Sequence, residues 1–485
     1  MSATSLRLSR RQALGLAAGG AVGAAGLRLV TLHLGGSSAS TVASAAGSAG
    51  AWSSPLGDSR AQAAHLLRRA GFGYSDAELD SAASLGYDDL VAKLVNQQPD
   101  VPAPPTDTVT YTAVSQWWYQ HMASTQAQFP ERMLLFWHGV LTSDFRKTNR
   151  FPYIYQQNQL YRRAGAGDLR TLLLETTYDP AMMRYLDLDQ STVKAPNENY
   201  SRELMELFTL GVGNYTETDV REGARALSGL RIQPIDKAGA PVQLPKRGTG
   251  VNAIQDYYKA LQDLINSGVT FRGVLMPRAH DNGTKTYLGR SGNLGAADVI
   301  DAILAKDACA NFIANKALLY FSVPNPSNDY VSRIATTFRN SKYDTKAMMT
   351  AIFRSDEFKA AANYRSLVRS PADFAVATMR ALGQPDIAKM AVAAGSTMDQ
   401  ILYDPPTVGG WPVNGGWISS GTWLARMNFA HAVVNRGGTL PDPVKAVHNQ
   451  LDGVVGADTA SVFNGSQTAS DRWFAILGSP EFHLK

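Results

Sequence analysis

The 485-residue sequence contains only one cysteine, Cys309, which excludes an intramolecular disulfide. It also carries little net charge. The formal charge of the whole chain is +5, but four of these charges come from arginines before Ala45, where no acidic residue occurs. A nearly neutral protein lacks the basic surface that nucleic-acid binding needs. We therefore expect no nucleic-acid partner, and we interpret Cys309, which lies in an apolar helical pattern, as a core residue.

A long apolar run is missing as well. The weakly apolar stretch Ala13 to Leu27 is interrupted at Arg28, before it reaches the roughly 20 residues that a membrane span needs. Paired arginines at Arg10 and Arg11 stand directly before it, and small residues near position 45 provide a cleavage site. This pattern predicts a twin-arginine export signal over residues 1–45. The protein would then be periplasmic, cell-surface or secreted, with no membrane span after signal removal. Retention of the signal as an anchor is the alternative.

The sequence shows neither an internal repeat nor the strand and helix alternation of a parallel sheet. Helical periodicity and helix-start signals dominate from Ser59 onward. We expect a mainly α fold, in which a linker at 46–57 precedes a single large helical domain at 58–485. An irregular insertion at about 231–275 interrupts it, and a small β-hairpin element is expected from residues 269–276 and 284–288. Helices are expected at 114–125, 130–141, 295–306, 308–321, 331–339, 345–353, 371–382 and 423–434.

The stretch Pro196 to Gly229 combines more ionisable and amide side chains with a regular apolar pattern than any other part of the sequence. Apolar residues recur there at helical spacing and would form a buried stripe. A break at Gly211 to Gly213 follows, and Thr216 with Asp219 gives a capping-box start for a second helix. On the face opposite the stripe lie Asn199, Arg202, Glu203 and Glu206.

Two interpretations of this polar face remain open. Arg202 is four residues from both Glu198 and Glu206, so the charges could form solvated ion pairs of a few tenths of a kcal/mol each. Against this, the run Asn197-Glu198-Asn199 suits a buried, hydrogen-bonded helix start.

Three further clusters could join this helix in a site. The first is His138, in an aromatic, apolar helix, where a core role with one hydrogen bond is equally expected. The second is the polar loop that carries His280, Asp281 and Lys285, which is also good turn chemistry. The third is the loop Asp404 to Ile418, whose glycines, prolines, Trp411 and Trp417 describe a rigid segment that could equally plug the core.

These segments together resemble a bacterial family known as domain of unknown function 1800. The resemblance covers about residues 65–482, nearly the whole chain after the signal. The matching motifs are the HLLRRAGFG opening at 65–73, FWHG at 136–139, DPAM to YLD at 179–187, NEN-aromatic-x-RELxEL at 197–207, the HD loop at 280–289 and PP-x-V-x-GW at 405–411.

The resemblance implies export, a mostly helical fold and a neighbouring exported protein that looks like a sulfatase or phosphatase, which would be a partner. Members often carry a histidine where this chain has Val140 and another where it has Phe208. These departures argue against a metal held by those histidines. The family implies no activity, and the residues specify no cofactor.

The leading hypothesis is a hydrolase that acts on an envelope or environmental polysaccharide through paired carboxylates. Glu203 would be the general acid or base with Glu206 beside it, since two acids three residues apart on a helix raise each other's pKa when buried. The remaining roles are these: His138 and His280 orient the acids, Asp281 and Glu198 are further acid candidates, Lys285 binds an anion or hydroxyl, Asn197, Asn199 and Arg202 contact substrate, and Trp411 and Trp417 offer flat faces to sugar rings.

Two alternatives remain open. Glu198, Glu203, Glu206, His138, His280 and Asp281 together could form a carboxylate and histidine site for iron, manganese or zinc. The protein could instead be a non-catalytic exported scaffold that works with a partner, in which case the same acids would pair with basic and backbone groups and leave no cleft.

Overall fold

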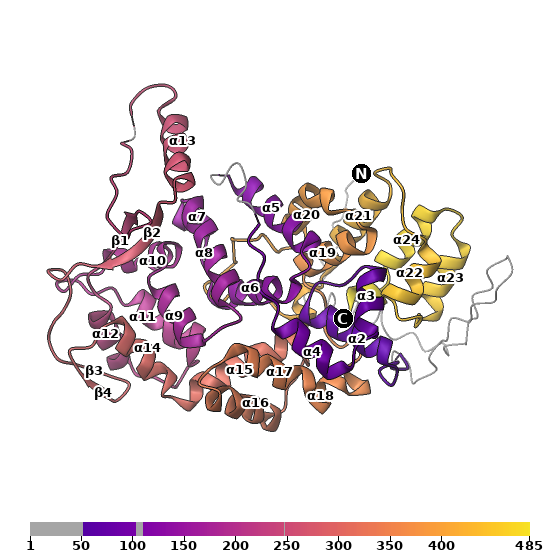
Figure 1. Ribbon diagram of the computed structural model, residues 1–485, viewed down its shortest axis with the longest axis horizontal. Helices are drawn as coiled ribbons and strands as arrows, with labels where there is room; N and C mark the ends of the chain where they lie inside the picture. The colour runs from indigo at the N-terminus through magenta and orange to yellow at the C-terminus, as the bar shows by residue number, and fades with distance from the viewer. Residues whose placement is uncertain (1–51, 103–109, 247) are drawn as a thin grey trace, which may run out of the picture.

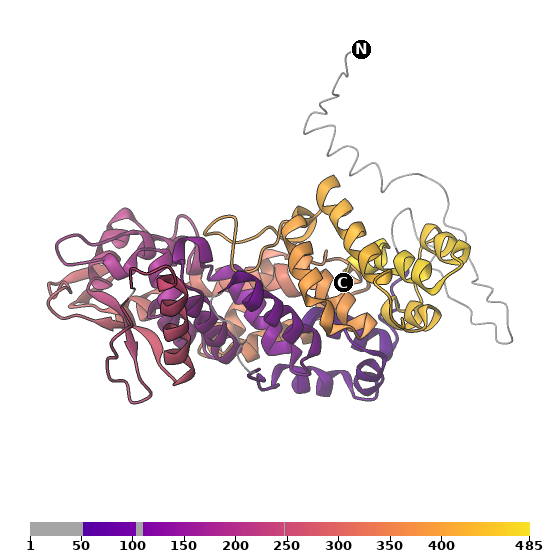
Figure 2. The ribbon, with the colours of Figure 1, turned by 90° about the horizontal axis from the view of Figure 1, so that it is seen from above.

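The computed structural model describes residues 52–102, 110–246 and 248–485. Those residues form 24 α-helices and two small antiparallel sheets, which confirms the mainly α prediction. The molecule is elongated, with the sheets at one end and the C-terminal helices at the other (Figures 1 and 2). None of the described helices has the length and apolarity to span a bilayer. The predicted export signal and the first half of the linker, residues 46–51, lie outside the described residues.

In the first third of the domain, helices begin at capping residues that the sequence indicates. Ser75 Oγ accepts the Glu78 N–H at 3.3 Å, and Glu78 Oε2 accepts the Ser75 N–H at 2.7 Å, so two backbone donors at this helix start are satisfied. The helices are α2 (Ser59–Ala70), α3 (Asp76–Ala83), α4 (Tyr87–Val95), α5 (Tyr111–Ser124), α6 (Gln128–Val140), α7 (Phe145–Thr148), α8 (Phe151–Ala164), α9 (Leu169–Thr177) and α10 (Pro180–Tyr185), with the short 3-10 turn η1 (Leu188–Gln190).

The central stretch folds as predicted in outline. Helix α11 (Asn199–Glu203) runs directly into a π-helical segment, η2 (Leu204–Thr209), and α12 (Glu217–Ala226) follows. The Thr216 and Asp219 capping box is present, with Thr216 Oγ1 accepting the Asp219 N–H at 3.2 Å. π-Helical turns are rare and often occur at functional sites.

Two expectations about the middle of the chain were wrong. The stretch 231–275 is not irregular, because it contains β1 (Leu230–Ile235), α13 (Ala253–Asn266) and β2 (Thr270–Leu275). Both strands expected at 269–276 and 284–288 are present, in two small antiparallel hairpin sheets, but they do not pair with each other. β2 pairs with β1, and β3 (Lys285–Tyr287) pairs with β4 (Arg290–Gly292), both antiparallel. β1 was missed because its residues, Leu-Arg-Ile-Gln-Pro-Ile, are followed by a long run without a period.

The C-terminal part is helical, close to the predicted boundaries. Its elements are α14 (Ala296–Leu304), α15 (Asp307–Phe321), α16 (Asn328–Asn340), α17 (Thr345–Arg354), α18 (Asp356–Lys359), η3 (Ala361–Asn363), α19 (Pro371–Leu382), η4 (Pro385–Ile387), α20 (Ala388–Thr397), η5 (Asn414–Trp417), α21 (Ser420–Val434), α22 (Pro443–Gln450), α23 (Ala457–Gly465), α24 (Ala469–Leu477) and α25 (Pro480–His483). Cys309 is fully buried in α15, and burial raises the pKa of its thiol to about 12, which suits a core residue.

The loop at 404–413 is held against the end of α6. Thr142 Oγ1 donates to the Val408 carbonyl at 2.6 Å. Gly410 has a φ of +88° and touches Gly139 so closely that an added Cβ would lie 2.3 Å from the Gly139 carbonyl oxygen. Glycine is needed there both for the left-handed backbone and for the close approach.

We predict that Gly410→Ala lowers the free energy of unfolding by about 3 kcal/mol, because it combines left-handed strain with overpacking. The matched control is Gly409→Ala, whose Cβ would meet nothing nearer than Thr407 Oγ1 at 3.5 Å and whose backbone is not left-handed. We expect that change to cost less than about 1 kcal/mol. Urea unfolding of the two variants measures both values, and equal losses would contradict the close approach.

Candidate functional site

A cavity of about 610 Å³ lies between α8, the junction of α9 and α10, and the β1 and β2 sheet. Strand β2 is fixed over α8 by the amide of Gln156, whose Oε1 accepts the Phe271 N–H at 2.8 Å and whose Nε2 donates to the Phe271 carbonyl. On the other side the Gly273 N–H donates to the Tyr178 carbonyl at 2.8 Å. These bonds hold the cavity walls apart at fixed positions.

Asp179 lies in the wall of this cavity with only 3% of its surface exposed. It is the N-cap of α10, and its Oδ1 accepts the Met182 N–H at 2.9 Å. The same oxygen accepts a second bond, at 2.7 Å, from Gln157 Nε2, which also donates to Ser143 Oγ. The carboxyl group is therefore held in one orientation by the helix start and by α8.

Burial raises the pKa of Asp179 from 3.8 to about 7. The hydrogen bonds from Met182, Gln157 and the Ala181 backbone favour the ionised form and act in the opposite direction, but they are outweighed because no cation lies close enough to offset the desolvation. Asp179 thus exchanges its proton near neutral pH, which is the range in which a general acid is most effective.

The other lining groups are a second carboxylate, an amide and several aromatic rings. Glu175, at the rim, accepts a bond of 2.6 Å from Arg163 Nη2. Gln159 Nε2 is buried and has no hydrogen-bond partner in the described part of the chain. The rings that line the cavity belong to Tyr155, Tyr178 and Phe271. Convergent polar groups in a cavity of this size with a perturbed acid are the features of a ligand site.

The central helix supports this site from behind. Tyr200 of α11 is buried, and its phenol is 2.8 Å from Thr177 Oγ1, two residues before Asp179. The charge of Asp179 is one reason why the pKa of Tyr200 is raised, after burial. The apolar face predicted for this helix therefore packs against the segment that carries the candidate acid.

The two acids predicted to be catalytic lie on the outer side of that helix. Burial and the neighbouring Glu206 raise the pKa of Glu203, as the spacing had predicted. Glu203 makes no side-chain hydrogen bond in the described part of the chain, but it lies near Tyr185 together with Asp144 and Asp404. Glu206 accepts a short hydrogen bond from the Tyr215 hydroxyl.

The remaining polar residues of the helix form surface contacts. Arg202 donates to both carboxylate oxygens of Glu217, at 2.7 and 2.8 Å, and reaches Glu198 at 3.3 Å. Asn197 Oδ1 accepts the Asn199 N–H at 2.9 Å just before α11, whose N-cap residue is Glu198. The expectation that this start is buried was wrong, since Asn199 is exposed.

His138 is enclosed by aromatic side chains near the end of α6. Its ring lies 5.1 to 5.3 Å from those of Trp118, Tyr403 and Trp411, and its Nε2 accepts the Tyr403 N–H at 3.0 Å. Burial lowers the pKa of His138 to about 3, so the ring stays neutral. It is the core histidine with one hydrogen bond that the sequence offered as the alternative. Trp417 does not touch it in any ring contact among the described residues.

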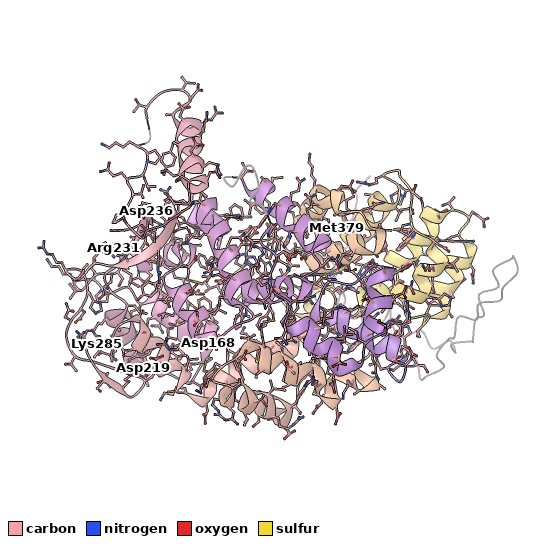
Figure 3. All side chains as sticks on the ribbon, viewed as in Figure 1. Asp168, Asp219, Arg231, Asp236, Lys285 and Met379 are labelled. Atoms are coloured by element: carbon pink, nitrogen blue, oxygen red, sulfur yellow. The ribbon has the colours of Figure 1, made fainter. Side chains whose placement is uncertain are left out.

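His280, Asp281 and Lys285 belong to a third environment. Asp281 pairs with Arg225 at 2.7 Å, and that hydrogen bond lowers the pKa of the carboxyl group. The His280 ring bonds the Ser228 carbonyl at 2.9 Å, and Lys285 Nζ donates to Asn293 at 3.1 Å and to the Asp281 carbonyl. Figure 3 shows Lys285 near Asp219 at one end of the molecule, far from Met379 of α19.

The predicted convergence of these groups is therefore wrong. Among the described residues no contact joins His138 or His280 to Glu203 or Glu206, and no three His, Cys, Asp or Glu side chains are grouped as metal ligands. In the sequence, Asp179 appears only as the first residue of the motif at 179–187. Leu172 to Leu174 before it and Ala181 to Met183 after it mark an apolar neighbourhood, but they do not show whether the carboxyl group itself is buried.

The sequence from residue 65 to residue 484 matches the family described as protein of unknown function (DUF1800). The chain belongs to this family. No curated protein and no solved structure matches it. Membership in DUF1800 confirms the resemblance that the six motifs indicated, and Asp179 opens one of those motifs. The family description names no chemistry, so only the geometry of the site indicates what it can do.

Asp179→Asn provides a test of the raised pKa. Asparagine caps helices well and keeps the oxygen that Met182 and Gln157 contact, so only the titratable proton is removed. Because the folded-state pKa of about 7 lies above the ordinary 3.8, the stability that this proton provides is complete below pH 3.8 and is lost as the pH rises through 7. As the pH rises between those limits, the free energy of unfolding of the wild type should fall by up to about 4 kcal/mol relative to that of the variant.

Urea unfolding of both proteins at pH 4.5, 6 and 8 measures this difference. A stability difference that does not change with pH would contradict the raised pKa.

Proposed function

We propose that the protein is a glycoside hydrolase that acts on an envelope or environmental polysaccharide, with Asp179 as its general acid. The observation that carries this proposal is a carboxyl group whose pKa of about 7 places its proton exchange at neutral pH, in the wall of a 610 Å³ cavity. Hydrolysis of a glycosidic bond needs such a group to protonate the leaving oxygen.

Glu175 is the second carboxylate that the reaction needs. The two acids of the cavity differ in environment: Asp179 is buried among apolar and amide groups, and Glu175 is paired with Arg163 at the rim. Such a difference separates the roles of two carboxylates in glycosidases. Glu175 would stabilise the positive charge that develops on the sugar, or direct water to it.

The substrate class follows from the lining of the cavity. Tyr155, Tyr178 and Phe271 offer flat apolar faces to sugar rings, and Arg272 lies over the Tyr178 ring at 5.5 Å. The unpartnered Gln159 Nε2 is a donor for a sugar hydroxyl. The ionisable residues of the lining are Arg163, Glu175, Asp179 and Arg272, with as many acids as bases, which suits a neutral or weakly charged polysaccharide.

Export by the twin-arginine route is part of the same proposal, because such polysaccharides lie outside the cytoplasm. It rests on the paired Arg10 and Arg11 before an apolar stretch. An exported partner that looks like a sulfatase or phosphatase remains a candidate from the family resemblance.

The scaffold alternative is favoured by one specific observation. Several charges of the central helix and of α12 are paired: Arg202 contacts Glu198 and Glu217, and Arg225 contacts Glu222 and Asp281. Those residues form a polar surface without a free catalytic pair. A non-catalytic role as an assembly protein would use that surface.

The hydrolase proposal is tested with purified protein and a panel of polysaccharides that includes peptidoglycan, chitin, xylan and a β-glucan, by measuring newly formed reducing ends. We expect Asp179→Asn to lower the rate at least 100-fold, because general acid catalysis contributes about 10²- to 10⁴-fold. Glu203→Gln, which leaves the cavity unchanged, should keep the wild-type rate.

The outcomes of this comparison distinguish the cavity at Asp179, the central helix and the scaffold alternative. Loss of activity in Glu203→Gln with full activity in Asp179→Asn would move the reaction to the central helix. Absence of new reducing ends from every substrate would favour the scaffold.

A further inference from the structure

A second cavity, separate from the one that holds Asp179, lies between α6, α15 and the loop that carries Trp411 and Trp417. Its volume is about 320 Å³. Its walls are mostly apolar, with Leu135, Val140, Leu319, Trp411 and Trp417 among the lining side chains. The close approach of Gly410 to Gly139 holds the loop in place and so fixes the shape of this cavity.

The cavity contains a lysine without a counter-ion. Lys316 of α15 lines it and is half-buried, and its ammonium group lies 5.0 Å from the centre of the Phe312 ring. No acidic side chain in the described ranges pairs with it. Burial alone lowers the pKa of Lys316, without a contribution from any carboxylate. The other lysine in the lining, Lys485, differs because it donates to Asp373 at 2.5 Å.

Two hydrogen-bond groups in the same lining also lack partners. The Tyr320 hydroxyl and the Trp411 indole N–H are buried and make no hydrogen bond within the part of the chain that the structure describes. Buried donors of this kind are normally satisfied, and each one left unpaired costs free energy. A ligand oxygen could accept from them.

The wall behind Tyr320 is electropositive. The Arg132 guanidinium lies 4.7 Å from the centre of the Tyr320 ring, and the Lys485 ammonium lies 5.4 Å from it. Both cations share the single carboxylate of Asp373 with Arg369. Among the side chains at this wall, positive charge exceeds negative charge, so an anion would be attracted into the cavity.

We propose that this cavity binds an amphipathic carboxylate, with its apolar chain between Leu319, Val140 and the two tryptophans and its carboxylate at Lys316. Lys316 gains the counter-ion that the residues described by the structure do not supply. The apolar walls remove the hydrocarbon from water, which provides the main driving force for binding. The free alkanoate is the expected ligand, and the proposal does not depend on the hydrolase activity.

The test is a titration of the full chain with decanoate, decanol and decylamine, which share a chain length and differ in head group. Binding is followed by calorimetry and by the fluorescence of the tryptophans that line the cavity. We expect saturable binding of decanoate that weakens at least tenfold in Lys316→Met, while decanol binding is the same in both proteins. Lys389→Met, an exposed lysine of α20 outside the cavity, is the matched control and should bind decanoate like the wild type.

A second variant tests the location independently of charge. Leu319→Trp fills the cavity and should abolish binding of both decanoate and decanol, with an unchanged circular dichroism spectrum showing that the chain is folded. The proposal is overturned if the wild type does not bind decanoate saturably, if Lys316→Met binds it as tightly as the wild type, or if decylamine binds as well as decanoate.

Discussion

The centre of the molecule depends on one buried carboxylate, Asp373. It is 1% exposed, and it contacts Arg132 at 3.1 Å, Arg369 at 3.5 Å and Lys485 at 2.5 Å. These cations come from α6, from the residues before α19 and from the last residue of the sequence, so one side chain joins distant parts of the chain. Removal of one partner from a buried ion cluster leaves uncompensated charge and is far more destabilising than loss of a surface pair. The positive charge that Asp373 does not neutralise extends to the wall of the cavity at Lys316.

The loop at 404–413 determines the surroundings of Trp411. Because Gly410 lies against Gly139, Trp411 is placed over His138 on one side and in the lining of the smaller cavity. Trp411 therefore belongs both to the aromatic cluster around His138 and to the lining of the smaller cavity. The same loop position brings Trp411 against the buried, neutral His138 and into the lining that also includes Lys316.

Local features of the fold could be predicted from the sequence, because they depend on neighbouring residues. Three such features each follow from the spacing of residues within a single helical segment. They are the Thr216 cap of α12, the start of α19 and the raised pKa of Glu203 beside Glu206. Strand pairing could not be predicted, since β1 and β2 are separated by a whole helix. The candidate site was also missed, because an N-cap aspartate looks the same whether solvent or a protein interior surrounds it. Asp179 is distinguished by its burial, which depends on packing against α8 and on β2, a strand that lies far from α10 in the sequence.

The balance at Asp179 explains what the polar central helix contributes. Hydrogen bonds from a helix start normally keep a capping carboxyl group ionised, and here the Met182 and Ala181 backbone bonds act in that direction, together with one from the Gln157 side chain of α8. Burial outweighs them only while the surroundings stay dry and without a cation. Tyr200, fixed to Thr177 by its hydroxyl, fills part of those surroundings with an aromatic ring. The charged face of the same helix is turned outward, where Arg202 pairs with Glu217 instead of reaching Asp179. The helix thus helps to keep the pKa of Asp179 raised, by packing and by holding its own cation away from the carboxyl group.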